Sequence, residues 1–348
     1  MVGTYKCPGC GAPIEFDGRA GEMVCDYCGA HVNVSQMNEE TDRYDSVVES
    51  LEEDNAEYGD FDAYKCSNCG AEIMTDEHTS ATSCSYCGSP AIIKGRLNGT
   101  LMPQSVIPFK ITEENAKEIF RRWTKKGPLT PSMFRREATI ESLKGIYVPF
   151  WLYDYNAHIN MSARAAKIKR ERRGNTEYTH TSNYGVERVM ECTYDKIPAD
   201  ASEKMPDSVM DRLEPFNYGE LTKFQMPYLS GYSSEKFNYT KDEMNYRAER
   251  RARTYVYQEC RNSITGYDRV HVTGSHTRLQ RKAATYALLP VWYFGYTYKG
   301  KQDVFAINGQ TGKIVGKLPI SKGKAVAWFG GIFAGISTVL FVIGGLLG

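Results

Sequence analysis

Eight of the ten cysteines form a repeat that limits how the N-terminal part of the chain can fold. Residues 5–34 realign on residues 64–93 with a constant offset of 59 positions. Both copies have the spacing C-x2-C-x14-C-x2-C, and a glycine follows each pair of cysteines. The cysteines of the first copy are Cys7, Cys10, Cys25 and Cys28, and those of the second copy are Cys66, Cys69, Cys84 and Cys87.

This spacing is typical of a structural zinc site. Two thiolates on a tight turn can bind one ion, and a second such turn across a short hairpin completes a tetrahedron. The residues between the turns, among them Ile14 and Phe16, suit a β-hairpin rather than a helix. Each copy is therefore predicted to be a zinc ribbon that holds one structural Zn²⁺ and is unfolded without it. A rubredoxin-like iron site has the same ligands and remains an alternative. A disulfide framework is disfavoured in a reducing cytosol. A thioredoxin-like redox pair is a further alternative.

The C-terminal segment 325–348 contains no charged residue over 24 positions. As a helix it would be about 36 Å long, enough to cross the hydrocarbon core of a bilayer. Trp328 lies near its start, and Lys313, Lys317, Lys322 and Lys324 precede it. The positive-inside rule then predicts a single-pass protein of the cell membrane with its N-terminal bulk in the cytoplasm. The first residues show no export signal, which agrees with this orientation.

Charge is strongly segregated along the chain, although the net charge is only +1. Residues 1–98 carry 6 basic and 18 acidic side chains, and eleven of the acids lie in the segment 39–62, which reads as a solvated linker. We call residues 1–98 the head. With zinc bound, the head is more negative still and would repel DNA, so nucleic acid is a disfavoured partner. The only basic footprint for it lies in residues 99–320. A cluster there contains Arg164, Lys167, Lys169, Arg170, Arg172 and Arg173, and the predicted helix 241–264 adds Arg247, Arg250, Arg251 and Arg253.

The body is rich in tyrosine and in alternating, strand-like stretches. Apolar periodicity and breakers predict helices over 112–126, 131–143 and 241–264. The stretch from Ile146, IYVPFWLYDY, resembles LLPVWYFGY from Leu288 in the order of its proline, tryptophan and tyrosine residues, which indicates an internal duplication. Turn signals after Tyr298 and at Asn308 predict two hairpins.

No catalytic constellation is found. The stretch GQTGK at residues 309–313 lacks the upstream glycine and the following Ser or Thr of a phosphate-binding loop. His271 and His276 have no nearby acidic or cysteine cluster, and Cys192 and Cys260 are expected to be buried small apolar groups. We therefore expect a protein that is not an enzyme and has no small-molecule substrate.

The expected fold class is multidomain α+β. The expected order is a zinc ribbon (1–35), an acidic linker (36–63), a second zinc ribbon (64–98), a basic, aromatic-rich α+β body with an internal duplication (99–320) and a transmembrane helix (325–348).

This order of parts resembles a family of bacterial membrane proteins named as TFIIB-type zinc-ribbon proteins, some of which are also named as replication-restart helicase-like. The resemblance is carried by the eight cysteines, YVPFW, PVWYFGY, the INGQTGKIVGKLP hairpin and the C-terminal apolar segment. It implies association with membrane-stress modules that contain SPFH proteins and relatives of phage-shock protein A. We expect a membrane-anchored scaffold that recruits partner proteins. A membrane-tethered nucleic-acid-binding regulator and a redox or zinc sensor are the alternatives.

Overall fold

The computed structural model describes residues 2–40, 61–66, 71–76, 78–84, 89–93, 102–136, 143–298 and 300–347. Its N-terminal elements are β1 (Val2–Gly3), β2 (Glu15–Asp17), β3 (Glu22–Val24), β4 (His31–Val32), α1 (Val34–Glu40), β5 (Phe61–Lys65), β6 (Glu72–Asp76), β7 (Thr79–Ser83) and β8 (Pro90–Ile93). The body begins with β9 (Ser105–Val106), α2 (Glu113–Lys125), η4 (Ser132–Arg135), β10 (Lys144–Arg173) and β11 (Thr176–Asp200). It continues with α4 (Asp207–Leu213), η5 (Tyr218–Glu220), β12 (Thr222–Lys223), η6 (Met226–Leu229), β13 (Ser233–Glu235), α5 (Lys241–Asn262), β14 (Arg269–Tyr298), β15 (Lys301–Asn308), β16 (Ile314–Val315) and α6 (Lys322–Leu347).

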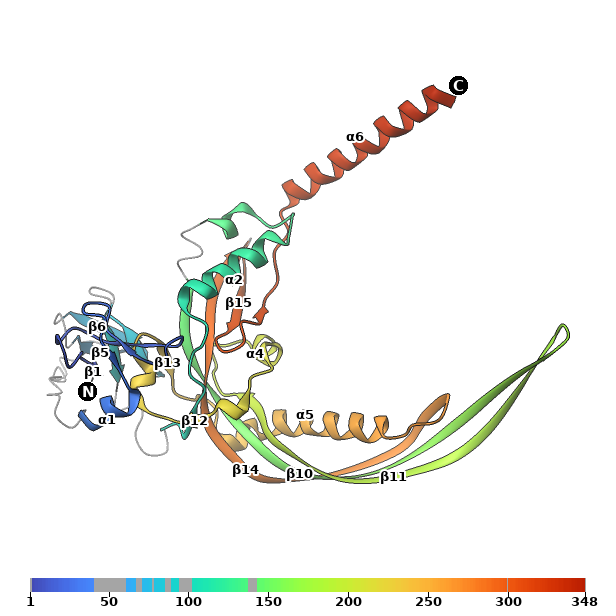
Figure 1. Cartoon of the computed structure of the whole chain (residues 1–348), viewed down its shortest axis with the longest axis horizontal. Coiled ribbons are helices and arrows are strands. Elements are labelled where there is room, and N and C mark those ends of the chain that lie inside the picture. Colours follow the sequence, from blue (N-terminus) through green and yellow to red (C-terminus); the bar gives the residue numbers. More distant parts are fainter. Residues whose placement is uncertain are drawn as a thin grey trace.

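One mixed sheet forms the spine of the molecule. Its strands follow the order β1-β8-β7-β13-β10-β14-β15-β16, so the path leads from the N-terminal strand to the strand that precedes α6 (Figure 1). At its centre, β10 and β14 pair antiparallel from Lys144↔Tyr293 to Ala166↔Arg269. The paired core residues, including Tyr147, Phe150 and Leu288, are fully buried. The fold is therefore mixed α+β and rich in strands, as expected.

The two aromatic stretches that resemble each other in sequence lie side by side in β10 and β14, where Tyr147 is paired with Pro290 and Pro149 with Leu288. A short strand lies parallel to each of them. β9 of the first unit pairs with β14 at Ala287, whereas β13 of the second unit pairs with β10 at Ile146. The short strand of each unit thus pairs with the long strand of the other unit, in equivalent registers.

The two helices that follow these short strands are fixed in the same way. The indole Nε1 of Trp151 donates to the carbonyl of Tyr239, two residues before α5, at 2.8 Å. The indole Nε1 of Trp292 donates to the carbonyl of Ile111, two residues before α2, also at 2.8 Å. Threonine caps both helices, Thr112 for α2 and Thr240 for α5. The two units therefore occupy equivalent places about a local pseudo-twofold axis.

The symmetry ends beyond Tyr155, where β10, β11 and the first half of β14 continue as a long three-stranded arm (Figure 1). One face of the arm buries alternate residues of β10, such as Ile159 and Met161, against Val256 and Cys260 of α5. The opposite face carries polar residues, and the tip at residues 170–180 extends past the end of α5. The equivalent hairpin of the second unit, β14–β15, closes at once between Tyr298 and Lys301.

The N-terminal head is joined to the body by backbone pairing and by packing. Val2 of β1 pairs with Ile93 of β8, and Ala81 of β7 pairs with Ser234 of β13. In the first hairpin, the Phe16 N–H donates to the carbonyl of Ser230 at 3.1 Å. The Phe16 ring meets the ring of Tyr228 edge-on, with centroids 5.0 Å apart.

Helix α6 is long enough and apolar enough to cross a membrane, judged by length and composition alone. None of the residues Lys322–Leu340 is buried. It extends away from the rest of the chain (Figure 1). Its root is attached to the segment that follows α2. The Ser321 N–H donates to the carbonyl of Leu129 at 2.9 Å, and the Lys324 Nζ donates to the carbonyl of Thr130 at 2.7 Å.

The predicted helices 112–126 and 241–264 are confirmed as α2 and α5, and both predicted hairpins are present. The helix predicted over 131–143 is only the 3-10 turn η4 where the structure describes it. The backbone turns extended at Arg136, with ψ of 144°, and this ends the turn after Arg135. Residues 137–142 and most of the acidic segment 39–62 lie outside the described residues.

A buried ion-pair network fixes α5 to the end of β11 and to α4. The Arg247 guanidinium lies 2.9 Å from Asp200, 3.0 Å from Asp207 and 2.9 Å from Asp211. Arg247 is 4% exposed and Asp200 is 1% exposed. Burial raises the pKa of Asp200 to about 6, even though Arg247 acts in the opposite direction. This carboxylate therefore depends on Arg247 for its charge.

Replacing Arg247 by Met should lower the stability of the chain by about 3–5 kcal/mol, because the substitution leaves the Asp200 carboxylate buried without its cation. The double variant R247M/D200N should recover much of this loss, since a neutral amide costs less to bury. The midpoint of thermal unfolding of the full chain in detergent measures both effects.

The matched control is R253M, because Arg253 lies on the same helix but is largely exposed, where it contacts Glu249 and the carbonyl of Thr277. It should change stability by less than about 1 kcal/mol. Equal losses for R247M and R253M would show that the buried network contributes nothing.

Candidate metal centre

The four cysteines of the first copy come together in the head. Their Sγ atoms all lie within 4.8 Å of one another. The Sγ atoms of Cys7 and Cys28 are 3.6 Å apart, as are those of Cys10 and Cys25. In a tetrahedron with Zn–S bonds of about 2.3 Å, neighbouring sulfurs are separated by about 3.8 Å. The first copy is thus positioned to bind one metal ion, and its donor set and sulfur separations fit a tetrahedral thiolate site.

Two tight turns build this geometry from the backbone. The Cys7 N–H donates to the carbonyl of Ala12 at 2.7 Å, and the Cys25 N–H donates to the carbonyl of Ala30 at 3.0 Å. The glycine after each turn, Gly11 or Gly29, has a φ of +75° or +71°, a conformation that favours glycine. The hairpin β2–β3 joins the turns, as predicted. Cys7 and Cys25 are buried, whereas Cys10 and Cys28 are exposed.

The pKa values of Cys7 and Cys28 favour the binding of a cation at this cluster. Burial raises the pKa of Cys7, but hydrogen bonds from the backbone at Cys10 and Gly9 and from neighbouring thiols bring it down to about 7. At Cys28 the backbone of Ala30 lowers the pKa, but the neighbouring thiols raise it to about 12. The cluster therefore loses its first proton easily and its last one only with difficulty. A divalent ion removes this obstacle by neutralising the thiolates, so binding releases protons.

The second copy is described in part. The Cys66 N–H donates to the carbonyl of Ala71 at 2.7 Å, and the Cys84 N–H donates to the carbonyl of Ser89 at 2.9 Å. These bonds are the equivalents of those in the first copy, and both cysteines are buried. Cys69 and Cys87 lie outside the described residues, so a second metal site stays a prediction.

Other residues considered from the sequence form no comparable cluster. Among the described residues, the first-copy cysteines are the one group of three or more potential ligands close enough to hold an ion. His276 lies in a shallow polar hollow of the arm with His158 and Arg278. Cys260 is buried on the face of α5 that packs against the arm, as expected, and Cys192 of β11 is half-buried in the same cluster.

The basic cluster of the arm is divided between the two faces of β10. Because side chains alternate along a strand, Lys167, Lys169 and Arg173 lie on one face, and Arg164, Arg170 and Arg172 lie on the other. Glu171 also contacts two of the first group, with a distance of 2.7 Å from Lys169 and 3.7 Å from Arg173. No single face carries all six cations, which weighs against a nucleic-acid surface here.

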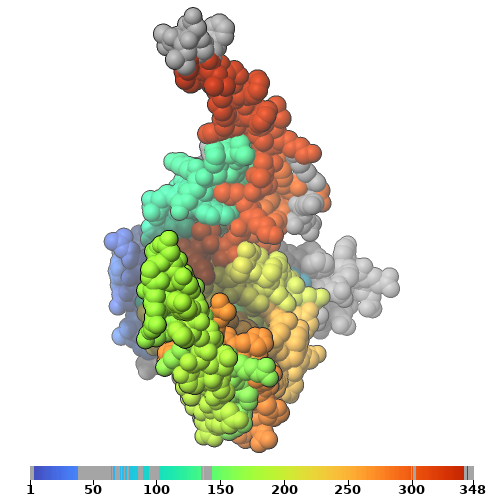
Figure 2. All heavy atoms as spheres, turned by 90° about the vertical axis from the view of Figure 1, so that its right-hand side faces the viewer, coloured from blue at the N-terminus to red at the C-terminus, as the bar shows by residue number. Residues whose placement is uncertain are grey.

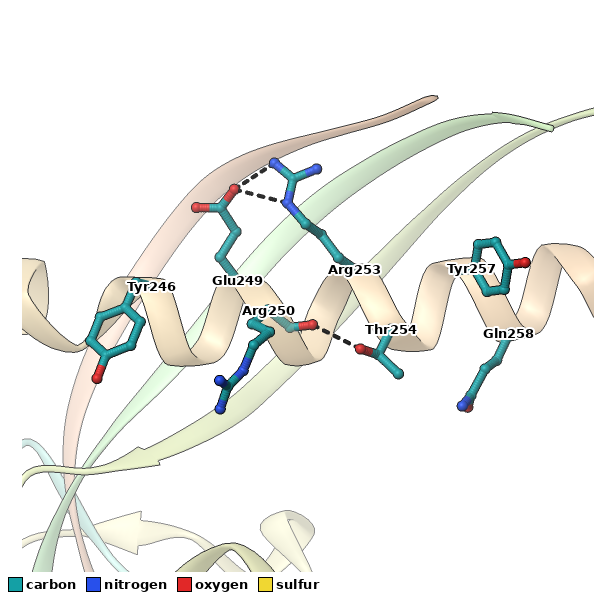
Figure 3. Close-up of a pocket in the computed structure, with 7 residues that line it drawn as sticks. All are labelled: Tyr246, Glu249, Arg250, Arg253, Thr254, Tyr257 and Gln258. Carbon is teal, nitrogen blue, oxygen red and sulfur yellow. Dashed lines mark hydrogen bonds and ion pairs between the residues drawn. The ribbon is translucent and has the colours of Figure 1, made fainter. Parts of the chain in front are cut away.

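A shallow groove runs along the solvent side of α5 (Figure 3). Its lining contains an ion pair between Arg253 and Glu249 at 2.6 Å and a hydrogen bond from Thr254 to the carbonyl of Arg250 at 3.0 Å. These polar groups pair with each other along the helix, and Arg253 also donates to the carbonyl of Thr277 in β14 at 2.8 Å. The exposed Tyr246 points away from the Glu249–Arg253 pair. The groove therefore does not have the converging, unpaired groups of a catalytic site.

Comparison with curated proteins gives a relative over the full length. The uncharacterized protein YdjG of Bacillus subtilis (strain 168) is 40% identical over 348 residues, which are 100% of this chain and 99% of the relative. The chain belongs to the YdjG family. No protein-family model matches the chain, and no solved structure matches it. The match to YdjG spans every part described above, from the cysteine cluster through the arm to α6.

Replacing Cys25 by Ser should remove one metal equivalent per chain, because a ligand set of three thiolates binds the ion less tightly and exposes it to competing chelators. Elemental analysis of the full chain purified in detergent measures the metal content.

The matched control is C192S, which removes a half-buried thiol far from both turns and should leave the metal content unchanged. Unaltered metal content in C25S would contradict the assignment of the first site.

Proposed function

We propose that this protein is a non-enzymatic scaffold of the cell membrane, with a zinc-bearing head in the cytoplasm that binds partner proteins. The observation that carries the proposal is the continuous sheet that starts at β1 of the head and ends at β16, just before α6. Each step along this path is a backbone-paired neighbour. A head built into the body in this way keeps a defined position relative to the membrane, which is the property that a scaffold needs.

Zinc is the ion that we propose for the first site, and a second Zn²⁺ for the second copy. Four thiolates with no open position favour a structural ion over a catalytic one. Iron prefers the same four ligands in some proteins, so the element itself is decided by elemental analysis.

Helix α6 is the proposed anchor, as a single-pass transmembrane helix. The lysines before it favour the orientation with the bulk of the chain in the cytoplasm. This orientation also keeps the cysteines in a reducing compartment, where thiolates remain available for a metal.

The proposed partner surface is the outer side of the head. Phe16 and Ile14 of the first hairpin contact the body through Ser230 and Tyr228. Among the described residues, Cys10 and Cys28 of the metal turns are exposed. Tyr27 lies between Cys25 and Cys28 on one of these turns and is 86% exposed, more than the other large hydrophobic residues of the described chain. Tyrosine in such a place is a common anchor of protein interfaces. By the resemblance noted above, the expected partners are SPFH proteins or relatives of phage-shock protein A.

Replacing Tyr27 by Ala should weaken recruitment of a phage-shock-protein-A relative to membranes by at least about tenfold, because truncating an interface anchor costs about 2 kcal/mol. Flotation of vesicles that contain the full chain measures the recruited partner. Metal content must stay unchanged in this variant, which shows that the head is intact.

Y178A is the matched control, because Tyr178 is also an exposed tyrosine but lies near the tip of the arm. It should recruit the partner as the wild type does. Normal recruitment by Y27A would reject the head as the partner surface.

A further inference from the structure

Two distant segments of the chain, both strongly basic, meet at the root of α6. Residues 121–136 contain six Lys or Arg and no acid, and residues 313–324 contain four Lys and no acid. In the structure they are in contact through the bonds from Ser321 to Leu129 and from Lys324 to Thr130. The cations at the end of α2 therefore lie near the lysines that precede the apolar helix, although the two groups are far apart in the sequence.

The side chains of this place are available to a ligand. Lys125 and Lys126 at the end of α2 are exposed, and so are Arg136, Lys317 and Lys322. We call these five residues the collar. Two neighbouring cations are excluded, because Arg122 pairs with Glu118 at 3.5 Å and Lys313 donates to the carbonyl of Glu214. Figure 2 shows α2 and the segment after it directly against the root of α6.

A local role explains only part of the collar. Cations in the last turn of a helix stabilise its C-terminal dipole, and Lys125 has this position in α2. The same explanation does not extend to Arg136, which follows η4, or to Lys317 and Lys322, which precede α6. Like charges concentrated on one surface repel one another unless an anion lies among them.

The position of the collar at the start of α6 indicates which kind of anion it would bind. The Lys324 Nζ, in the first turn of α6, reaches the Thr130 carbonyl, so the segment after α2 lies level with the start of the apolar helix. If α6 crosses the membrane, this level is that of the lipid headgroups. We propose that the collar binds the headgroups of anionic phospholipids and so presses the end of α2 against the cytoplasmic leaflet. The inference rests on the proposed membrane anchoring by α6.

Lipid binding at the collar would fix the orientation of the body relative to the membrane as well as its distance from it. A single helix crossing a bilayer leaves the attached body free to rotate and tilt about its root. A second contact, on the α2 side of the root, removes this freedom and sets the direction of the head and of the arm relative to the membrane. Each lysine or arginine near an anionic surface increases affinity by about fivefold, so five of them can hold such an orientation.

The test uses the full chain in nanodiscs that contain equal amounts of phosphatidylglycerol and phosphatidylcholine. Native mass spectrometry counts the lipids that stay bound to the chain when it is released from the disc. The wild type should retain phosphatidylglycerol in clear excess, and high salt should reduce the excess. The variant K125Q/K126Q/K317Q/K322Q should lose this excess by about tenfold or more.

The matched control removes four cations from the arm, K167Q/K169Q/R170Q/R172Q, and should keep the wild-type lipid ratio. Equal retention by the collar and arm variants, in chains that are inserted in the disc, would overturn the lipid site but not the anchor. A wild-type chain that does not insert at all would instead reject the proposed membrane anchoring. The two failures are therefore distinguishable.

Discussion

The antiparallel pairing of β10 with β14 is the interaction on which the rest of the structure depends. It aligns two aromatic core strands, and each of them accepts the short strand of the opposite unit, β13 beside β10 and β9 beside β14. The buried Trp151 and Trp292 then hold the starts of α5 and α2. Because the head pairs with β13 and the root of α6 follows β16, both ends of the chain are positioned by this central pair.

The two units differ in the elements that extend from the shared core. In the second unit the hairpin β14–β15 turns at once, whereas in the first unit β10 and β11 extend into the arm. The longer α5 and the first half of β14 cover and extend the same arm. The head attaches to β13, while the equivalent strand β9 pairs with the short β12 instead. We interpret the body as a duplicated core that carries the head on one unit and α6 on the other.

The sequence predicted the parts that depend on residues close together in the chain, because cysteine spacing and apolar periodicity are patterns within short segments. The cysteine turns, the hairpin with Phe16, the helices α2 and α5 and the apolar α6 belong to this group. It did not predict how the parts are joined. Pairing of Ala81 with Ser234 and contact of Thr130 with Lys324 are long-range choices that no short pattern specifies. One further signal was present, since Ser105, Phe109 and Thr112 recur as Ser233, Phe237 and Thr240 at a constant offset, which marks the exchanged strands and the two helix caps.

The strand pairing from β1 to β16 holds the metal-binding head in one position relative to the root of α6. Electron-spin distance measurement between genetically encoded spin labels at the exposed Arg19 and Ser132, in the full chain in nanodiscs, tests it most directly. We expect one narrow distance distribution that broadens when a chelator removes the metal, since the head unfolds without its ion. A broad distribution in the metal-loaded chain would show instead that the head moves freely relative to α6.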